Sequence, residues 1–508
     1  MRADSVMGGE GVPIELDRRN ASFAEVRETH VGVVFLVGDH AYKLKKPVDV
    51  GFLDFTSRQR RLAACQREVE LNRRLAPDVY LGVADVIGPD GSVCDHLVVM
   101  RRMPDQRRLS SLIQRGEPVD DIVRHLARLV AAFHATARRA PHISVEGTRD
   151  AILGRWMASF DQIRELGKVA MAPGTLAEIR RRTVEFLAGR DPLFAARIAK
   201  GRVVDGHGDL LADDIFCLDD GPRVLDCLEF DDRLRFLDGL DDISFLAMDL
   251  EHRGAPELAG RLLDWYAEFA DDPAPMSLRH HYLAYRAFVR AKVTTIRHVQ
   301  GDDAAGATAI DFADLALRHL RSGTVRLVLV GGLPGTGKST LGSLLADDLG
   351  MVLLSSDRMR KELLGLSPAD HRPTDYREGI YAPAYTERTY AGLLARAETL
   401  LAHGESVVID ASWTSATHRR RASELAERTH SELVSLRCCV SAEIAAARMR
   451  ARRGAISDAD PAIAASMAAH ADDWPEASVV CTTGPRADSL KQALSILHSD
   501  SASVNDHR

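Results

Sequence analysis

The pattern of apolar and polar residues changes most sharply near residue 330. Residues 327–330 form an apolar run, Leu-Val-Leu-Val, which is typical of a buried strand. Leucines recur at helical spacing in the segment 341–349, which predicts a helix. The apolar run 351–354 and the mostly apolar stretch 406–409 predict two further strands. Strands that alternate with helices predict an α/β domain with a mostly parallel sheet, which we place at residues 324–498.

Residues 13–321 show a different order of elements. The stretch 31–46 contains two apolar runs on either side of a Gly-Asp turn, which predicts a β-hairpin. A helix is expected at 61–75 and a strand at 97–100, and from about residue 109 onward the apolar positions follow helical spacing. Strands followed by many helices predict an α+β domain.

Composition limits the class of protein. The chain has 508 residues, of which 45% are hydrophobic and 27% charged, as in a soluble globular protein of more than one domain. The net charge of -7 argues against broad nucleic-acid binding, so no nucleic-acid partner is expected. Seven cysteines without a CxxC pair predict reduced thiols in a cytoplasmic protein. No apolar run approaches the ~20 residues of a membrane span, so no membrane association is expected; the oligomeric state is left open.

The segment after the first C-terminal strand contains the pattern GxxxxGK[ST]. Glycines let the backbone wrap a phosphate, so that N–H groups and a helix N-terminus point at it. Lys338 is expected to reach the β- and γ-phosphates of ATP, and the Ser339 hydroxyl to bind Mg²⁺. The predicted nucleotide-binding residues are Gly332, Leu333, Pro334, Gly335, Thr336, Gly337, Lys338, Ser339 and Thr340.

Charged residues near the other C-terminal elements supply further candidates. Asp357 follows the second strand, where it is placed to take a proton from a substrate hydroxyl; helix capping is the alternative. Asp410 ends a short buried strand, as in a Walker B motif, and would hold Mg²⁺. Arg448 and Arg452 lie in an arginine-rich segment that would close as a lid over the transferring phosphate; a solvated basic face is the alternative.

The N-terminal part carries a second set of candidates. Lys43 and Lys45 share one face of a predicted strand, and Glu68 lies on the next predicted helix. A lysine–glutamate pair of this kind orients ATP phosphates in kinase-like folds. Asp209 and Asp226 lie at the ends of apolar runs; Asp209 would accept the proton of an acceptor hydroxyl, and Asp226 would hold Mg²⁺. Surface lysines and an acidic turn are the structural alternatives.

These N-terminal residues carry a family resemblance. The HGDL sequence at 207–210, Asp226 with its neighbours, and the block 28–55 resemble the aminoglycoside phosphotransferase family, a branch of the kinase-like fold. The resemblance covers most of residues 20–315 and implies an ATP-binding kinase-like domain. The family usually has an asparagine that binds the second metal where this chain has Asp214. Asp214 is therefore a candidate metal ligand, and the departure keeps open a degenerate domain that only binds or senses.

The C-terminal motifs resemble a second group. GLPGTGKST at 332–340, SSD at 355–357 and VVIDA at 407–411 are similar to small P-loop kinases such as zeta toxins and gluconate kinase. The two resemblances together imply an ATP-dependent phosphotransferase that acts on a hydroxyl of a small molecule. Two alternatives are a P-loop kinase or ATPase regulated by a silent kinase-like domain, and an ATP-driven switch without an acceptor.

Two charged helices complete the expectations. The segment 236–250 is read as a helix whose four aspartates mostly face water or cap neighbouring elements. Arg286 and Arg290 are neighbours on one face of a later helix. They would meet an anionic substrate or pair with the acids of the first helix, and pairing is favoured.

Overall fold

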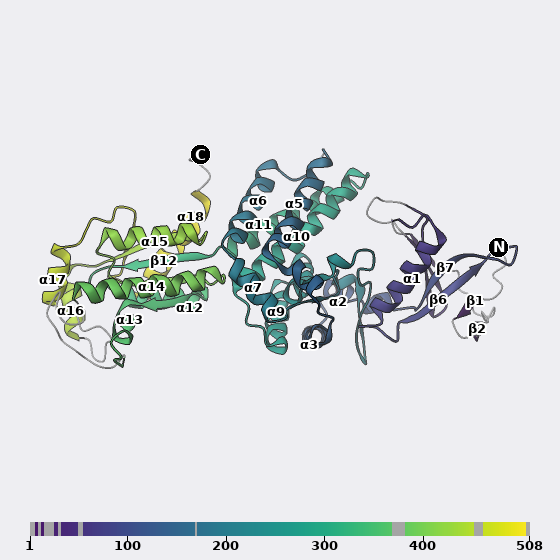
Figure 1. Ribbon diagram of the computed structural model, residues 1–508, viewed down its shortest axis with the longest axis horizontal. Coiled ribbons are helices and arrows are strands. Elements are labelled where there is room, and N and C mark those ends of the chain that lie inside the picture. The colour runs from purple at the N-terminus through teal and green to yellow at the C-terminus, as the bar shows by residue number, and fades with distance from the viewer. Residues whose placement is uncertain are drawn as a thin grey trace.

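The computed structural model describes residues 6–8, 12–14, 25–28, 32–48, 54–167, 170–367, 382–451 and 461–503. The molecule is elongated and has three parts in a row (Figure 1). A sheet with helix α1 lies at one end, a block of helices lies in the middle, and an α/β unit around β12 lies at the other end. Among the described residues, none of the helices has the length and apolar character needed to cross a membrane.

The N-terminal sheet is antiparallel throughout. Its described strands follow the order β2-β1-β6-β7-β5-β4-β3. They are β1 (Val6–Gly8), β2 (Val12–Ile14), β3 (Glu25–Glu28), β4 (Gly32–Val37), β5 (His40–Lys45), β6 (Tyr80–Ile87) and β7 (Val93–Arg101). Strands β4 and β5 form the predicted hairpin. Helix α1 (Arg58–Asn72) covers the sheet and buries Cys65 and Val69 in a cluster with Tyr80 and Val98.

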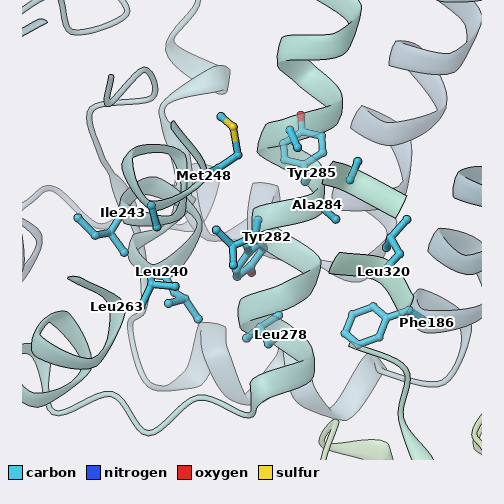
Figure 2. Close-up of a cluster of buried hydrophobic side chains, with 14 of the residues drawn as sticks. Phe186, Leu240, Ile243, Met248, Leu263, Leu278, Tyr282, Ala284, Tyr285 and Leu320 are labelled. Carbon is cyan, nitrogen blue, oxygen red and sulfur yellow. The ribbon is translucent and has the colours of Figure 1, made fainter. Parts of the chain in front are cut away.

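The middle part is mostly helical. Its helices are α2 (Leu109–Gln114), α3 (Asp120–Thr136), α4 (Pro141–Ser144), α5 (Arg149–Glu165), α6 (Pro173–Ala188), α7 (Asp191–Ala199), α8 (Gly239–His252), α9 (Pro256–Ala270), α10 (Met276–Val299) and α11 (Ala305–Ser322). Two short antiparallel pairs join β9 (Ile215–Leu218) to β10 (Gly221–Val224) and β8 (Val203–Asp205) to β11 (Phe236–Asp238). Figure 2 shows Leu240, Ile243 and Met248 of α8 beside Leu278 and Tyr282 of α10 in the core.

The segment 236–250 differs from its prediction. It begins as strand β11 and becomes helical only at Gly239. Residues 239–250 of α8 are all buried, including Asp241, Asp242 and Asp249, so the expectation that its acids mostly face water is wrong. Asp238 does cap the helix, because its side chain accepts a hydrogen bond from the backbone N–H of Leu240.

The C-terminal unit has the predicted parallel sheet. The strand order is β13-β14-β12-β15-β16, and every described pair is parallel. The strands are β12 (Arg326–Gly331), β13 (Val352–Ser355), β14 (Val407–Asp410), β15 (Glu432–Cys439) and β16 (Ser478–Cys481). The helices are α12 (Lys338–Leu349), α13 (Ser356–Glu362), α14 (Pro383–Ala402), α15 (Ala416–Arg428), α16 (Ala442–Ala451), α17 (Pro461–Ala469) and α18 (Arg486–Ser503).

The middle part packs directly against the α/β unit. The guanidinium of Arg190 is fully buried and donates a hydrogen bond of 2.6 Å to the carbonyl oxygen of Thr429. The Ser277 hydroxyl donates to the carbonyl oxygen of Gly404 at 2.7 Å. Apolar residues of both parts belong to one buried cluster. The division into domains at 13–321 and 324–498 stays a prediction, since the two parts share this core.

Candidate active sites

The loop between β12 and α12 has a backbone shape suited to an anion. Strand β12 ends at Gly331 and helix α12 begins with Lys338, so the loop leads into a helix N-terminus. Gly335 and Gly337 have φ angles of 82° and 89°, in the left-handed region that favours glycine. A Cβ on Gly335 would lie 2.6 Å from the carbonyl oxygen of Ala445, so no side chain fits there. Loops of this kind present backbone N–H groups to phosphate.

Lys338 is the charge that this loop holds in place. The residue is only 9% exposed. Within the described parts of the chain, neither a hydrogen bond nor an ion pair engages its ammonium group. A largely buried lysine without a nearby counter-charge is unfavourable, and a bound phosphate would supply the missing negative charge. Lys338 also lines a cavity of about 390 Å³, so an anion can reach it from there. The loop and its lysine therefore fit a triphosphate.

Two cavities flank the loop. The first, of about 390 Å³, is lined by polar side chains that include Lys338, Asp357, Glu387, Tyr390, His418 and Asp472. The second, of about 350 Å³, includes Gly335, Gly337, Thr340, Arg448, Thr482 and Arg486 in its lining. The glycine-rich loop thus contributes to both cavities, through Lys338 to the first and through its glycines to the second.

Asp357 opens onto the first cavity. Strand β13 ends at Ser355, and Asp357 lies in the first turn of α13. The helix is preceded by Ser355 as its N-cap, so Asp357 is not the capping residue. Its carboxylate accepts a hydrogen bond of 3.2 Å from Arg360 and lines the same cavity as Lys338. The arrangement brings an acid and the candidate phosphate-binding lysine to one cavity.

The candidate magnesium ligands lie at the same end of the sheet. Asp410 is the last residue of β14, in register with Val330 of β12, and is 4% exposed. A Cβ on Gly342 of α12 would lie 3.7 Å from the Cβ of Asp410, so this acid faces the helix that carries Ser339. Among the described residues, no group of three or more His, Cys, Asp or Glu side chains could hold a metal by itself. The carboxylate of Asp410 and the hydroxyl of Ser339 are oxygen ligands of the kind that Mg²⁺ prefers, and phosphate oxygens of a bound nucleotide would complete the set.

Of the two predicted lid arginines, only Arg448 is described. Its guanidinium Nη2 donates a hydrogen bond of 2.6 Å to the carbonyl oxygen of Thr482, and it lines the second cavity. A Cβ on Gly337 would lie 3.6 Å from its Nη1, which places the guanidinium beside the loop. Arg452 lies outside the described residues.

The N-terminal candidates also come together. Lys43 donates hydrogen bonds to Glu68 at 2.8 Å and to Asp226 at 2.9 Å. Lys45 donates to Glu68 and to Glu229, both at 2.7 Å, and is nearly fully buried. Although burial opposes it, the carboxylates of Asp226 and Glu68 raise the pKa of Lys43 well above its usual value. Lys43 is thus the lysine that joins the helix acid to the predicted metal ligand, whereas Lys45 lies in a buried ion-pair network.

The loop that carries Asp209 is held by Asp242, one of the aspartates that the sequence predicts mostly to face water or cap neighbouring elements. The buried carboxylate of Asp242 accepts hydrogen bonds from the backbone N–H groups of His207 at 2.7 Å and Gly208 at 2.9 Å. The carboxylate also lies 3.0 Å from Nε2 of His134. An acid in an otherwise apolar, buried helix needs such partners. The apolar residues around Asp242 in the sequence are therefore the signal from which its role could be found. Asp242 fixes the backbone of the two residues that precede the candidate base.

Three carboxylates interact around this loop. Burial raises the pKa of Asp209 to about 7, with Arg290 acting in the opposite direction. Burial, with the nearby Asp226 and Asp209 carboxylates, raises the pKa of Asp214 well above its usual value. Asp226 adopts a left-handed φ of 61°, which is uncommon for a residue with a side chain and clusters at functional sites. The pKa is therefore raised for Asp209 and Asp214, whereas the ammonium of Lys43 lowers the pKa of Asp226.

One arginine of α10 pairs with an acid of α8. Arg286 forms a buried ion pair of 2.7 Å with Asp241 of α8. Its guanidinium also lies 3.4 Å from the carbonyl oxygen of Gly208, to which it donates a hydrogen bond. The predicted pairing with the acids of 238–249 is confirmed for Arg286.

Comparisons with known proteins match the C-terminal unit and, separately, most of the chain. A model described as an AAA domain matches residues 327–473, which confirms the P-loop-type domain expected there. The protein Rv2004c of Mycobacterium tuberculosis (strain ATCC 25618 / H37Rv), described as uncharacterized, is 43% identical over 477 residues, or 94% of this chain and 96% of its own length.

Two solved structures align with stretches of this chain. A gluconokinase from Sinorhizobium meliloti 1021 aligns with 36% of this chain and 98% of its own, at 20% identity and a TM-score of 0.28. The GDP and kanamycin complex of APH(2")-IIia aligns with 59% of this chain and 94% of its own, at 16% identity and a TM-score of 0.38.

Proposed function

The chain belongs to the family that includes Rv2004c, and we propose that it is a phosphotransferase that moves the γ-phosphoryl group of ATP to a hydroxyl of a small molecule. The observation that carries this proposal is the largely buried Lys338, which has no partner among the described residues, on a glycine loop between two cavities. The loop would hold the phosphates, with the nucleoside in the second cavity beside Arg448. The acceptor would enter the first cavity, next to Asp357.

In this arrangement the residues of the chain mainly position the two substrates and neutralise the charge on the phosphate oxygens. Asp357 takes the proton of the acceptor hydroxyl while the oxygen of that hydroxyl attacks the γ-phosphorus. The bond between the γ-phosphorus and the bridging oxygen then breaks, and ADP leaves. Lys338 and the loop N–H groups stabilise the charge on the phosphate oxygens. Ser339 and Asp410 would hold Mg²⁺, which would supply further neutralisation. Arg448 lies beside the loop and stabilises the same charge.

The first cavity favours a polar acceptor. Its volume of about 390 Å³ is within the range of small-molecule sites. Its polar lining includes the hydroxyls of Ser356, Ser412, Thr414 and Ser415 and the imidazoles of His418 and His470. Such groups form hydrogen bonds with a molecule that carries several hydroxyls.

An acceptor screen tests the proposal. The full chain is incubated with ATP, Mg²⁺ and pools of sugars, aminoglycosides and nucleosides, and products are detected by the mass of one added phosphate. A product that forms with wild-type protein and with the surface variant Asp348→Asn, but not with Lys338→Met, supports the proposal. ATP hydrolysis without any phosphorylated product favours an ATP-driven switch instead.

A second function for the N-terminal part rests on the Lys43 contacts. Lys43 already pairs with Asp226, and Asp214 stands at the position of the usual asparagine, which together favour a domain that binds or senses a ligand and regulates the C-terminal kinase. Separate measurements of ATP turnover in Asp209→Asn and Lys338→Met decide between the readings. If only Lys338→Met loses turnover, the regulatory reading holds; if Asp209→Asn also loses a distinct product, both parts are transferases.

A further inference from the structure

Two cysteines lie side by side at the end of the C-terminal sheet. Cys439 is the last residue of β15 and Cys481 the last of β16, and the two are paired in register in adjacent parallel strands. Neighbouring strands lie about 4.8 Å apart, within the Cα separation of about 4.4–6.8 Å that a disulfide spans. Both are free thiols in the structure.

Their side chains share the accessible face of the sheet. The preceding pair in register, Cys438 and Val480, is buried in the core beneath the sheet. Because side chains alternate along a strand, Cys439 and Cys481 point to the opposite face. Cys481 is exposed and Cys439 is half-buried, so an oxidant in solution can reach the pair.

The pair is connected to the glycine-rich loop through the next residue. The backbone N–H of Thr482 donates a hydrogen bond of 3.1 Å to the carbonyl oxygen of Cys439. Its hydroxyl donates to the carbonyl oxygen of Thr336 in the loop, and its own carbonyl oxygen accepts from Arg448 at 2.6 Å. A shift at the end of β16 therefore reaches both the loop and the arginine of the second cavity.

We propose that Cys439 and Cys481 form a reversible disulfide that weakens nucleotide binding at the glycine-rich loop. The effect on affinity rests on the proposed function, whereas the bond itself does not. The backbone spacing already suits the bond, but the Cys481 sulfur has to turn away from the Thr483 hydroxyl, 3.5 Å away, toward Cys439. This turn shifts the end of β16 and displaces Thr482 from Thr336 and Arg448.

The chemistry needs a two-electron oxidant, which we take to be a peroxide. Thr483 lowers the pKa of the Cys481 thiol, mainly through its hydroxyl and to a smaller extent through its backbone N–H. A lower pKa raises the fraction of Cys481 that is thiolate. The Cys481 thiolate attacks one peroxide oxygen, the O–O bond breaks, and the hydroxide that leaves takes up a proton to become water. The Cys439 thiolate then attacks the sulfenic sulfur, the S–O bond breaks, and the hydroxide that leaves takes up the proton lost by the Cys439 thiol to become a second water. The two sulfurs are oxidised and the peroxide is reduced.

The test uses the full-length protein in reduced and peroxide-treated forms. Free thiols are alkylated, the protein is digested, and cross-linked peptides are identified by mass, while ATP affinity is measured by calorimetry. We expect a Cys439–Cys481 link, about tenfold weaker ATP binding, and recovery of both after treatment with a dithiol. Cys439→Ser and Cys481→Ser should keep their affinity under peroxide, and the remote, exposed Cys94→Ser should behave as wild type.

Three results overturn the proposal: a link between other cysteines, oxidised Cys481 that stays unlinked, or the expected link with unchanged ATP affinity. Reduced protein that binds no ATP overturns the proposed function and the effect on affinity together. In that case the peptide map still decides whether the bond forms, so the two failures can be told apart.

Discussion

Replacing Asp242 with asparagine is predicted to loosen the loop that carries Asp209. The carboxylate of Asp242 is fully buried and serves two backbone N–H groups, those of His207 and Gly208, together with His134. An asparagine of the same shape has one acceptor oxygen instead of two. It therefore turns an NH₂ group toward a backbone N–H that has no other partner in this arrangement.

The magnitude follows from these contacts. A hydrogen bond to a charged group contributes about 1.5–3 kcal/mol, and an unsatisfied buried N–H costs about 1–3 kcal/mol. With partial relaxation we expect a net loss of about 3 kcal/mol in the free energy that keeps the loop closed, which is roughly a 100-fold increase in local opening.

Hydrogen exchange measured by mass spectrometry reads this effect at the loop. Amides in a peptide covering residues 206–212 should exchange faster in Asp242→Asn, whereas a peptide covering β12 should be unchanged. The surface variant Asp161→Asn, on an exposed ion pair of α5, is the control and should leave both peptides unchanged. Equal protection of the loop in wild type and Asp242→Asn would refute the anchoring role.

The stability difference between wild type and Asp242→Asn should also depend on pH. Burial alone would raise the pKa of Asp242, but His134 and the backbone N–H of His207 hold it well below the usual value. A depressed folded-state pKa stabilises the fold above the unfolded value of about 3.9 and loses that contribution as pH falls. The difference in stability between wild type and Asp242→Asn should therefore shrink below about pH 4.

Three other outcomes follow from burial and charge. Lys338→Met should weaken ATP binding about 100-fold in calorimetry, the equivalent of about 3 kcal/mol for a charge-assisted contact, without lowering the urea midpoint; a lower midpoint would mean that the lysine has a structural partner. Lys45→Met leaves Glu68 and Glu229 less compensated and should lower the free energy of unfolding by about 3 kcal/mol in a urea titration, and an unchanged value would contradict the buried network. Burial raises the pKa of Asp209 to about 7, so ionisation disfavours the folded state as pH rises from about 4 to 7; Asp209→Asn should remove this loss and raise the urea midpoint at pH 8, and a lower midpoint would contradict it.

The C-terminal site was largely readable from the sequence because its determinants are local. An apolar run, a glycine pattern and a following helix are contiguous, and strands β13 and β14 end close to predicted acids. The cavities were not readable, because Glu387 and Asp472 come from elements far apart in the chain and meet only in the folded protein.

The N-terminal site was only partly readable. Period-two spacing placed Lys43 and Lys45 on one face, but only their contacts with Asp226 and Glu229 separate their surroundings. The role of Asp242 could not be read from its own helix, since its partners are backbone N–H groups more than 30 residues earlier. Hydrophobic spacing describes which face is buried, and it does not reveal which acids are buried with that face.

The most direct test of the central claim is single-turnover transfer from γ-labelled ATP to an acceptor identified in the screen. The account predicts that Asp357→Asn binds ATP with wild-type, magnesium-dependent affinity yet transfers label about 100-fold to 10,000-fold more slowly, as expected for loss of a general base. Transfer at the wild-type rate in Asp357→Asn, or wild-type protein without magnesium-dependent affinity for ATP, would contradict it.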